Sequence, residues 1–187
     1  MRNLIVSDIF GRTHALETLA SMLTMPTDFY DPYSAEQLEF ADEQAAYSYF
    51  QQHVTLKNYS ANLLEQIKSS RSPLNLIGFS VGASAIWQIS DTNNLINVNR
   101  ACCYYSSQIR HYLHVEPHFP VTLVFPASEN HFSLTPIMDS LANKQTVSVR
   151  QVPYLHGFMN PHSVNYNQQG YNDEMLALDN VLLNSIE

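Results

Sequence analysis

Short apolar runs alternate along the chain with longer segments in which apolar residues recur every three or four positions. The runs have the length of buried strands, and the spaced patterns are typical of amphipathic helices. Strands are expected at Leu4–Ile9, Asp28–Tyr33, Pro73–Ile77, Val98–Tyr105, Val121–Phe125 and Val147–Val152. Helices are expected at Thr13–Leu23, Ala35–Gln52, Leu56–Ser70, Ala83–Ile89, Thr135–Asn143 and Asp173–Ser185, and a surface loop at Asn160–Asn172. This alternation predicts an α/β fold with a mostly parallel sheet and helices on both faces.

Composition narrows the class of protein. The 187 residues show no linker or repeat, which predicts a single domain over 1–187, with the helical segment 34–70 as a candidate partial lid. Hydrophobic residues make up 45% and charged residues 14%, as in a soluble globular protein. A formal charge of −8 argues against nucleic acid or an anionic membrane surface as a partner. The first apolar run is too short for a signal peptide, so a cytoplasmic location is expected, as a monomer or homodimer.

The segment from Gly78 to Gly82 carries the most specific signal. A serine, Ser80, stands between the two glycines, after an apolar run and before a helical pattern. This is the G-x-S-x-G nucleophile elbow in its strand–turn–helix context. Larger side chains at the two glycine positions would collide with the neighbouring strand and helix. The alternative is a glycine-bracketed turn in which the serine only caps a helix.

A serine nucleophile needs a base and a third group that orients the base. His156 follows the last predicted strand, and Glu129 and Asn130 follow the preceding one, so the chain order is serine, acid, histidine. Charge chemistry favours Glu129, because an amide at Asn130 cannot stabilise an imidazolium by charge. His111, His114 and His118 lack further ligands at useful spacing, so no metal or cofactor is expected.

Several segments together resemble one enzyme family. Ser7–Gly11, Gly78–Ala83, Tyr104–Tyr105, Asn130–Phe132 and His156–Phe158 resemble, in order and spacing, the dienelactone hydrolase family of α/β-hydrolases. The resemblance implies an α/β-hydrolase fold and a serine- or cysteine-dependent hydrolase of a small-molecule ester. It also implies an oxyanion hole formed by the backbone amides of Ile9 and Val81.

The chain departs from that family in several ways. Ser80 stands where dienelactone hydrolase itself has a cysteine, and Asn130 replaces the family's aspartate. Asp8 matches a glutamate that lies beside the nucleophile in the family, although a turn-capping role is equally compatible with its position. The family's substrate-binding arginines have no clear match. The chain also begins at what resembles the family's third strand, which predicts an N-terminally trimmed sheet of about six strands.

Two main functional hypotheses remain open on the sequence, beside a third in which an acyl or peptide hydrolase acts on larger substrates with the segment Ser34–Ser70 as a lid. The first is a small serine esterase or lactonase that uses Ser80 and His156. The second is a non-catalytic protein of the same fold that binds a small molecule or a partner, which the missing aspartate and the trimmed start favour. The adjacent Cys102 and Cys103 are expected on opposite faces of a strand, as buried thiols.

Overall fold

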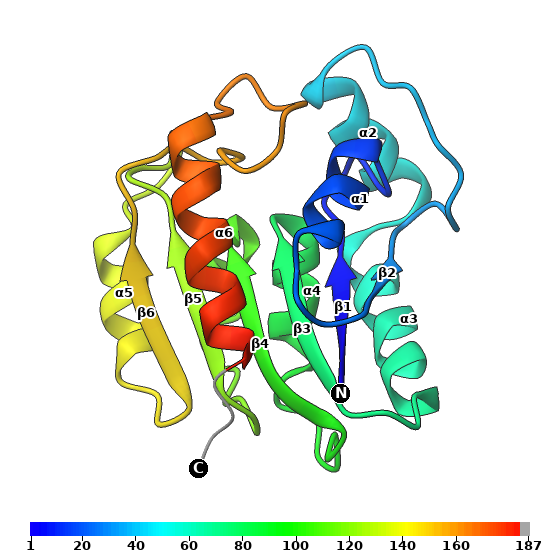
Figure 1. Cartoon of the computed structure of the whole chain (residues 1–187). Coiled ribbons are helices and arrows are strands. Elements are labelled where there is room, and N and C mark those ends of the chain that lie inside the picture. Colours follow the sequence, from blue (N-terminus) through cyan, green and yellow to red (C-terminus); the bar gives the residue numbers. More distant parts are fainter. Residues whose placement is uncertain (184–187) are drawn as a thin grey trace.

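The computed structural model describes residues 1–183, which fold as alternating strands and helices (Figure 1). The strands are β1 (Arg2–Val6), β2 (Thr27–Tyr30), β3 (Leu74–Phe79), β4 (Val98–Tyr104), β5 (Val121–Phe125) and β6 (Val147–Gln151). The α-helices are α1 (His14–Ser21), α2 (Glu43–His53), α3 (Leu56–Ser69), α4 (Val81–Ile89), α5 (Thr135–Ala142) and α6 (Gln168–Leu183), and a 3-10 helix, η1, spans Ser107–His111.

The strands form one six-stranded sheet in the order β2-β1-β3-β4-β5-β6. Every neighbouring pair is parallel, which confirms the predicted α/β class and the expected size of the sheet. The chain adds β2 on one side of β1 and then crosses to add β3 on the other side. A sheet of this kind opens a crevice at the carboxyl ends of the strands where the winding direction changes. Here that point lies between the ends of β1 and β3.

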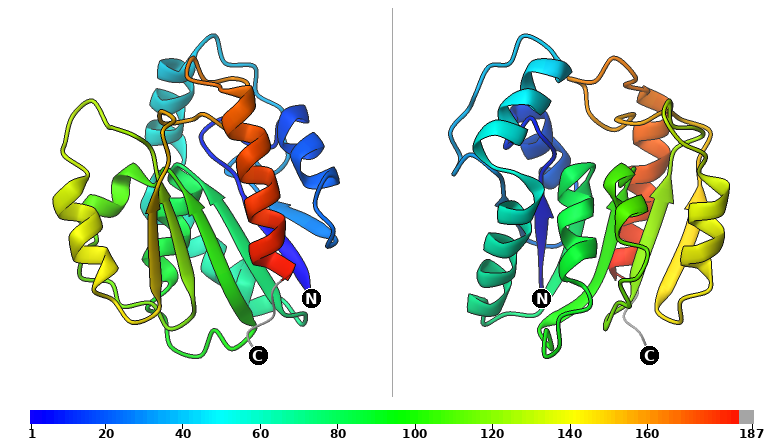
Figure 2. Two further views of the ribbon diagram at one scale, coloured as in Figure 1. Left: turned by 60° about the vertical axis from the view of Figure 1, so that its left-hand side comes forward. Right: turned by 180° about the vertical axis from the view of Figure 1, so that it is seen from behind.

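Helices cover both faces of the sheet. α1 and α6 lie on one face, and α3, α4 and α5 lie on the other, as the front and rear views show (Figures 1 and 2). Successive strand residues point to opposite faces, so Leu4 joins the core under α3 and α4, whereas Ile5 joins the core under α1 and α6. Cys103 and Cys102 divide in the same way, as predicted. Burial raises the pKa of the Cys102 thiol to about 12, which makes it unreactive.

Two helix boundaries differ from the sequence prediction by more than two residues. α2 begins at Glu43, not at Ala35, because Ala35 has a φ of 65° and its amide is bound by the Asp31 carboxylate in a turn. The helix instead starts after Asp42, whose side chain accepts the amide of Ala45 at 2.8 Å. At the other end of the chain, α6 begins at Gln168, so the predicted loop is shorter than expected. The predicted end of α6 at Ser185 lies outside the described residues.

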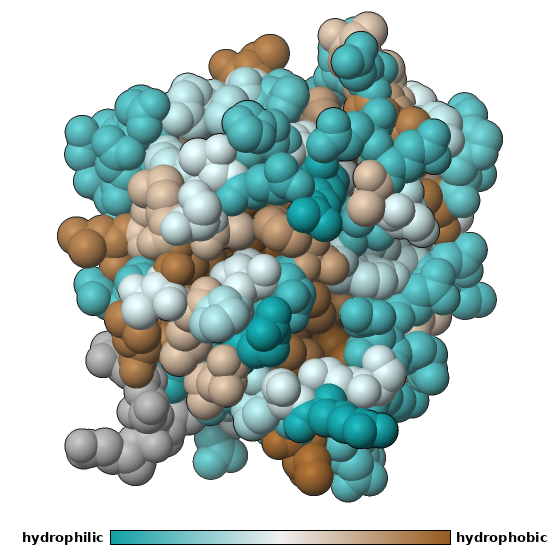
Figure 3. Space-filling view, turned by 45° about the vertical axis from the view of Figure 1, so that its right-hand side comes forward, coloured by the Kyte–Doolittle hydropathy of each residue, from teal (hydrophilic) through white to brown (hydrophobic). Residues whose placement is uncertain are grey.

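The face shown in Figure 3 is mainly hydrophilic, and apolar side chains show there both in recesses between polar ones and as separate protrusions at the edge of the view. Within residues 1–183, no helix combines the length and the apolar character needed to cross a bilayer.

Candidate active site

Ser80 lies on a strained turn between β3 and α4. Its backbone has φ 51° and ψ −112°, a conformation that residues other than glycine rarely adopt. The two glycines permit this turn. A Cβ atom on Gly78 would lie 2.6 Å from the Cα of Ala83 in α4, and one on Gly82 would lie 2.2 Å from the carbonyl oxygen of Val6 in β1. The start of α4 is therefore held against the end of β1.

The two residues expected to form the oxyanion hole lie near the nucleophile. Ile9, after β1, and Val81, at the start of α4, line the same cleft as Ser80. Within the described chain, neither amide donates a hydrogen bond to another protein group. The carbonyl of Ile9 accepts the phenol of Tyr33 at 2.7 Å, which fixes the orientation of that turn. The helix dipole of α4 adds positive potential at the same point.

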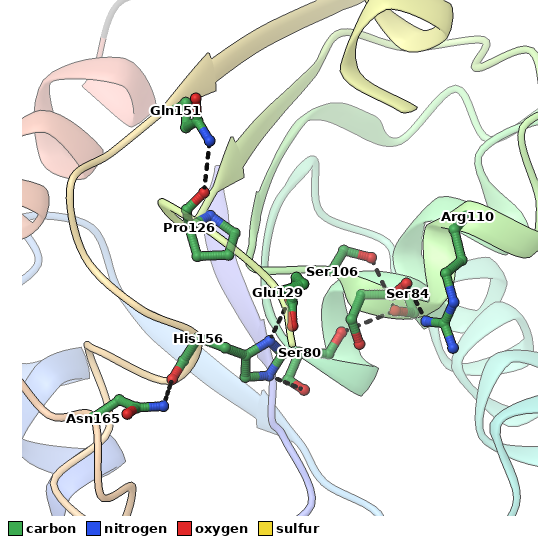
Figure 4. A network of polar contacts seen from close by, with 10 residues as sticks. Ser80, Ser84, Ser106, Arg110, Pro126, Glu129, Gln151, His156 and Asn165 are labelled. Atoms are coloured by element: carbon green, nitrogen blue, oxygen red, sulfur yellow. Dashed lines mark hydrogen bonds and ion pairs between the residues drawn. The ribbon is translucent and has the colours of Figure 1, made fainter. Parts of the chain in front are cut away.

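His156 lies between Ser80 and Glu129 (Figure 4). Its Nε2 is 3.1 Å from the Ser80 Oγ, and its Nδ1 is 2.8 Å from the Glu129 Oε1. The side chains of His156 and Glu129 are 21% and 12% exposed, so the pair is mostly screened from water. The geometry matches a nucleophile, a base and an orienting acid arranged in sequence.

The loops that carry these side chains are fixed by further hydrogen bonds. Gln151 Nε2 in β6 donates to the carbonyls of Pro126 and Ala127, both at 3.1 Å, and so holds the loop before Glu129. Asn165 Nδ2 donates to the carbonyl of His156 at 2.9 Å. The ring of Tyr105 packs beside the imidazole, with 5.1 Å between the ring centroids.

Asn130, the alternative acid position, lies elsewhere. It is exposed, lines the cleft, and makes no side-chain hydrogen bond to any residue that the structure describes. Of the two candidates, the structure thus brings only Glu129 to His156.

Asp8 both caps a turn and lies near the nucleophile, the two roles that were compatible with its position in the sequence. Its Oδ1 accepts the amide of Phe10 at 2.9 Å and thereby caps the turn after β1, and its Oδ2 accepts Asn160 Nδ2 at 2.6 Å. Asp8 also lines a small cavity together with Ser80 and His156. Burial raises the pKa of its carboxyl, while the two hydrogen bonds act in the opposite direction.

An open cleft of about 590 Å³ lies outside the nucleophile, a volume in the range of ligand pockets. Its wall includes Glu43, Gln44 and Tyr47 from α2. From the segment proposed as a lid, only α2 reaches the cleft, since α3 buries Tyr59 and other residues against the sheet and α4.

Sequence reasoning misses three side chains of this region: Glu43, Asn160 and Asn165. The last two lie on the Asn-rich segment after His156, whose composition predicts only a surface loop. Asn side chains can donate hydrogen bonds to loop carbonyls and to carboxylates. Their presence shortly after a candidate catalytic histidine is the signal that could have identified Asn160 and Asn165. Across residues 1–183, no three His, Cys, Asp or Glu side chains gather closely enough to hold a metal ion.

Comparison with known structures places this arrangement in a known fold. A provisionally assigned dienelactone hydrolase from Klebsiella pneumoniae superposes with a TM-score of 0.73 over 95% of this chain and 85% of its own, at 17% identity. The dienelactone hydrolase-like promiscuous phosphotriesterase P91, from metagenomic libraries, superposes with a TM-score of 0.66 over 97% of this chain and 85% of its own, at 13% identity. The chain has the α/β-hydrolase fold. The resemblance seen in the sequence is confirmed at the level of the fold.

Sequence comparison adds a nearer relative. The uncharacterized protein YczH of Bacillus subtilis (strain 168) is 36% identical over 130 residues, which are 68% of this chain. The match spans 63% of the length of YczH. No protein-family model matches the chain.

Proposed function

We propose that this protein is a serine hydrolase of small carboxylic esters or lactones. The proposal rests on two hydrogen-bond contacts of His156. Its Nε2 lies 3.1 Å from Ser80 Oγ, and its Nδ1 lies 2.8 Å from Glu129 Oε1. A serine that only capped α4 would direct its hydroxyl to a helix amide. Ser80 makes no such capping bond, and its hydroxyl faces the imidazole instead.

In the proposed reaction, His156 Nε2 removes the proton from Ser80 Oγ as the oxygen attacks the ester carbonyl. The carbonyl oxygen becomes an oxyanion, which the free amides of Ile9 and Val81 stabilise. Nε2 then gives the proton to the departing alcohol, leaving an acyl-enzyme on Ser80. A water molecule, deprotonated by the same imidazole, hydrolyses that ester and regenerates the serine.

Glu129 acts through the imidazole. By accepting a hydrogen bond from Nδ1–H, Glu129 keeps Nε2 free to receive the serine proton, and its charge stabilises the imidazolium that forms. Asp8 does not contact His156 through a hydrogen bond, because its oxygens accept hydrogen bonds from the Phe10 amide and from Asn160.

A matched pair of variants tests the proposal with p-nitrophenyl acetate. Ser80→Ala should lower kcat at least a thousandfold while the variant remains folded, because no covalent intermediate can form. Ser107→Ala, a second serine of the same cleft, should retain activity. Equal turnover by wild type and Ser80→Ala, or no turnover by a folded wild type on a panel of esters and lactones, would favour the non-catalytic hypothesis.

A further inference from the structure

Two small cavities lie close to the nucleophile, and the first of them adjoins the open cleft. The first, which we call the inner cavity, has a volume of about 10 Å³. It shares Ser80, His156, Ile9 and Glu43 with the open cleft, and its lining also includes Asp8, Tyr105 and Asn160. A volume of this kind accommodates one water-sized group, and a methyl group is of similar size.

The second cavity, of about 20 Å³, continues beyond the same wall. It shares Asp8, Tyr105 and Asn160 with the inner cavity, and its far side is apolar, formed by Leu16, Leu19, Phe79 and Met159. The side chains of Asp8 and Asn160, joined at 2.6 Å, thus form a partition between the two spaces.

The partition is held rigidly. The backbone amide of His162 donates to Asn160 Oδ1 at 2.9 Å, which turns Nδ2 of the same amide toward Asp8. The Asp8 carboxylate is in turn fixed by the amide of Phe10. Because both ends of the bond are anchored to backbone, the side chains cannot move aside without loss of hydrogen bonds, two of which are partly buried.

The outer cleft has the opposite character. It is open, about 590 Å³ in volume, and combines polar side chains with aromatic rings, among them Glu43, Gln108, Arg110, Tyr47 and Phe132. One half of an ester bound at Ser80 therefore meets a space for about one methyl group, and the other half meets a wide polar surface.

We infer that the inner cavity is the acyl subsite and that the substrates are esters of a very small neutral acyl group, acetyl above all, with a larger polar alcohol that lies in the outer cleft. This inference rests on the proposed function. Longer acyl chains would have to displace the Asp8–Asn160 pair. Acyl groups that carry a carboxylate would approach the carboxyl of Asp8, so like charges disfavour them whenever Asp8 is ionised.

The test is a chain-length series of p-nitrophenyl esters with acetyl, butyryl and hexanoyl groups, assayed for kcat/KM. Wild type should prefer acetate to butyrate at least tenfold, since hydrophobic pockets discriminate about tenfold or more per misfit methylene. Asn160→Ala should remove one side of the partition and join the cavities, lowering the acetate-to-butyrate ratio at least fivefold. Met159→Ala enlarges only the second cavity, so this single variant should keep the wild-type acetate-to-butyrate ratio. The double variant Met159→Ala/Asn160→Ala should also hydrolyse the hexanoate ester.

The outcomes separate this inference from the proposed function. Wild-type hydrolysis that depends on Ser80 but is as fast on butyrate as on acetate would overturn the acyl subsite and leave the serine hydrolase intact. A folded Asn160→Ala variant that keeps the wild-type ratio would overturn the acyl subsite in the same way. If Asn160→Ala does not fold, the wild-type series alone decides, because a preference for acetate supports the acyl subsite and equal rates on acetate and butyrate overturn it. Absence of both hydrolysis and covalent labelling at Ser80 would overturn the two proposals together.

Discussion

The role of Glu129 gives the sharpest single prediction. Glu129→Gln keeps the shape of the side chain and its hydrogen-bonding reach but removes the charge beside His156. The Oε1–Nδ1 distance of 2.8 Å puts the charge centres of carboxylate and imidazolium at about 4 Å, where unit charges attract by about 4 kcal/mol at an effective dielectric constant of about 20. Exposures of 12% and 21% leave part of this attraction screened by water. We therefore expect kcat to fall between about tenfold and a thousandfold, since about 1.4 kcal/mol of barrier corresponds to tenfold.

The matched variant is Asn130→Asp, which places a new carboxylate one residue further along the exposed part of the loop. Both proteins should be assayed on p-nitrophenyl acetate, with melting temperatures recorded to confirm folding. Asn130→Asp should raise kcat little, because Glu129 already lies beside Nδ1 of His156. If Glu129→Gln leaves kcat unchanged and Asn130→Asp raises it strongly, the reasoning is refuted and the triad is degenerate.

Three further predictions concern the site and its support. His156→Ala should abolish most ester turnover and change the melting temperature little, because the residue lies on a loop; a large fall in melting temperature with activity retained would mark it as structural. Gly82→Ala should destabilise the fold by about 1–3 kcal/mol in a denaturant titration, since its Cβ would meet the carbonyl of Val6 at 2.2 Å, and unchanged stability would contradict this contact. Burial raises the folded-state pKa of Asp8 above its ordinary 3.8, so the folded protein binds the proton more tightly and wild type loses stability as pH rises from that value to the raised one. As pH rises through that window, the melting temperature of Asp8→Asn should therefore increase relative to that of wild type, and above the window the difference should stay constant. A difference that is independent of pH would show that Asp8 does not titrate in this way.

The strands and the elbow are predictable because their signals are local. Each strand is a short apolar run, and the turn at Ser80 is specified by the glycines at 78 and 82, whose packing against α4 and β1 is as expected. The start of α1 is equally local, because Thr13 is a favoured N-cap residue and accepts the amide of Leu16 in the structure.

The remaining features depend on side chains that compete with these patterns. The residues before α2 have a helical composition, but the Asp31 carboxylate binds the amides of Tyr33 and Ala35 and forms a turn there. At α6 the predicted start is too late because the first turn is rich in Gln, although Asn167 accepts the amide of Gly170 at 2.9 Å as an N-cap would.

The inner cavity is not predictable from sequence at all. It depends on a hydrogen bond between Asp8 and Asn160, which lie 152 residues apart. Only the fold brings the turn after β1 to the loop after His156. The choice between Glu129 and Asn130 has the same origin, because neighbouring residues in a loop differ in orientation and sequence does not specify which one turns inward.

The most direct test of the central claim is covalent labelling of the nucleophile. The folded protein is treated with a fluorophosphonate and measured by intact mass, and the labelled protein is then digested and mapped. We predict a single adduct on Ser80, formed rapidly in wild type, slowed strongly in His156→Ala, and absent in Ser80→Ala. A folded wild-type protein that gains no adduct, or an adduct that maps to another serine, would contradict the proposed nucleophile.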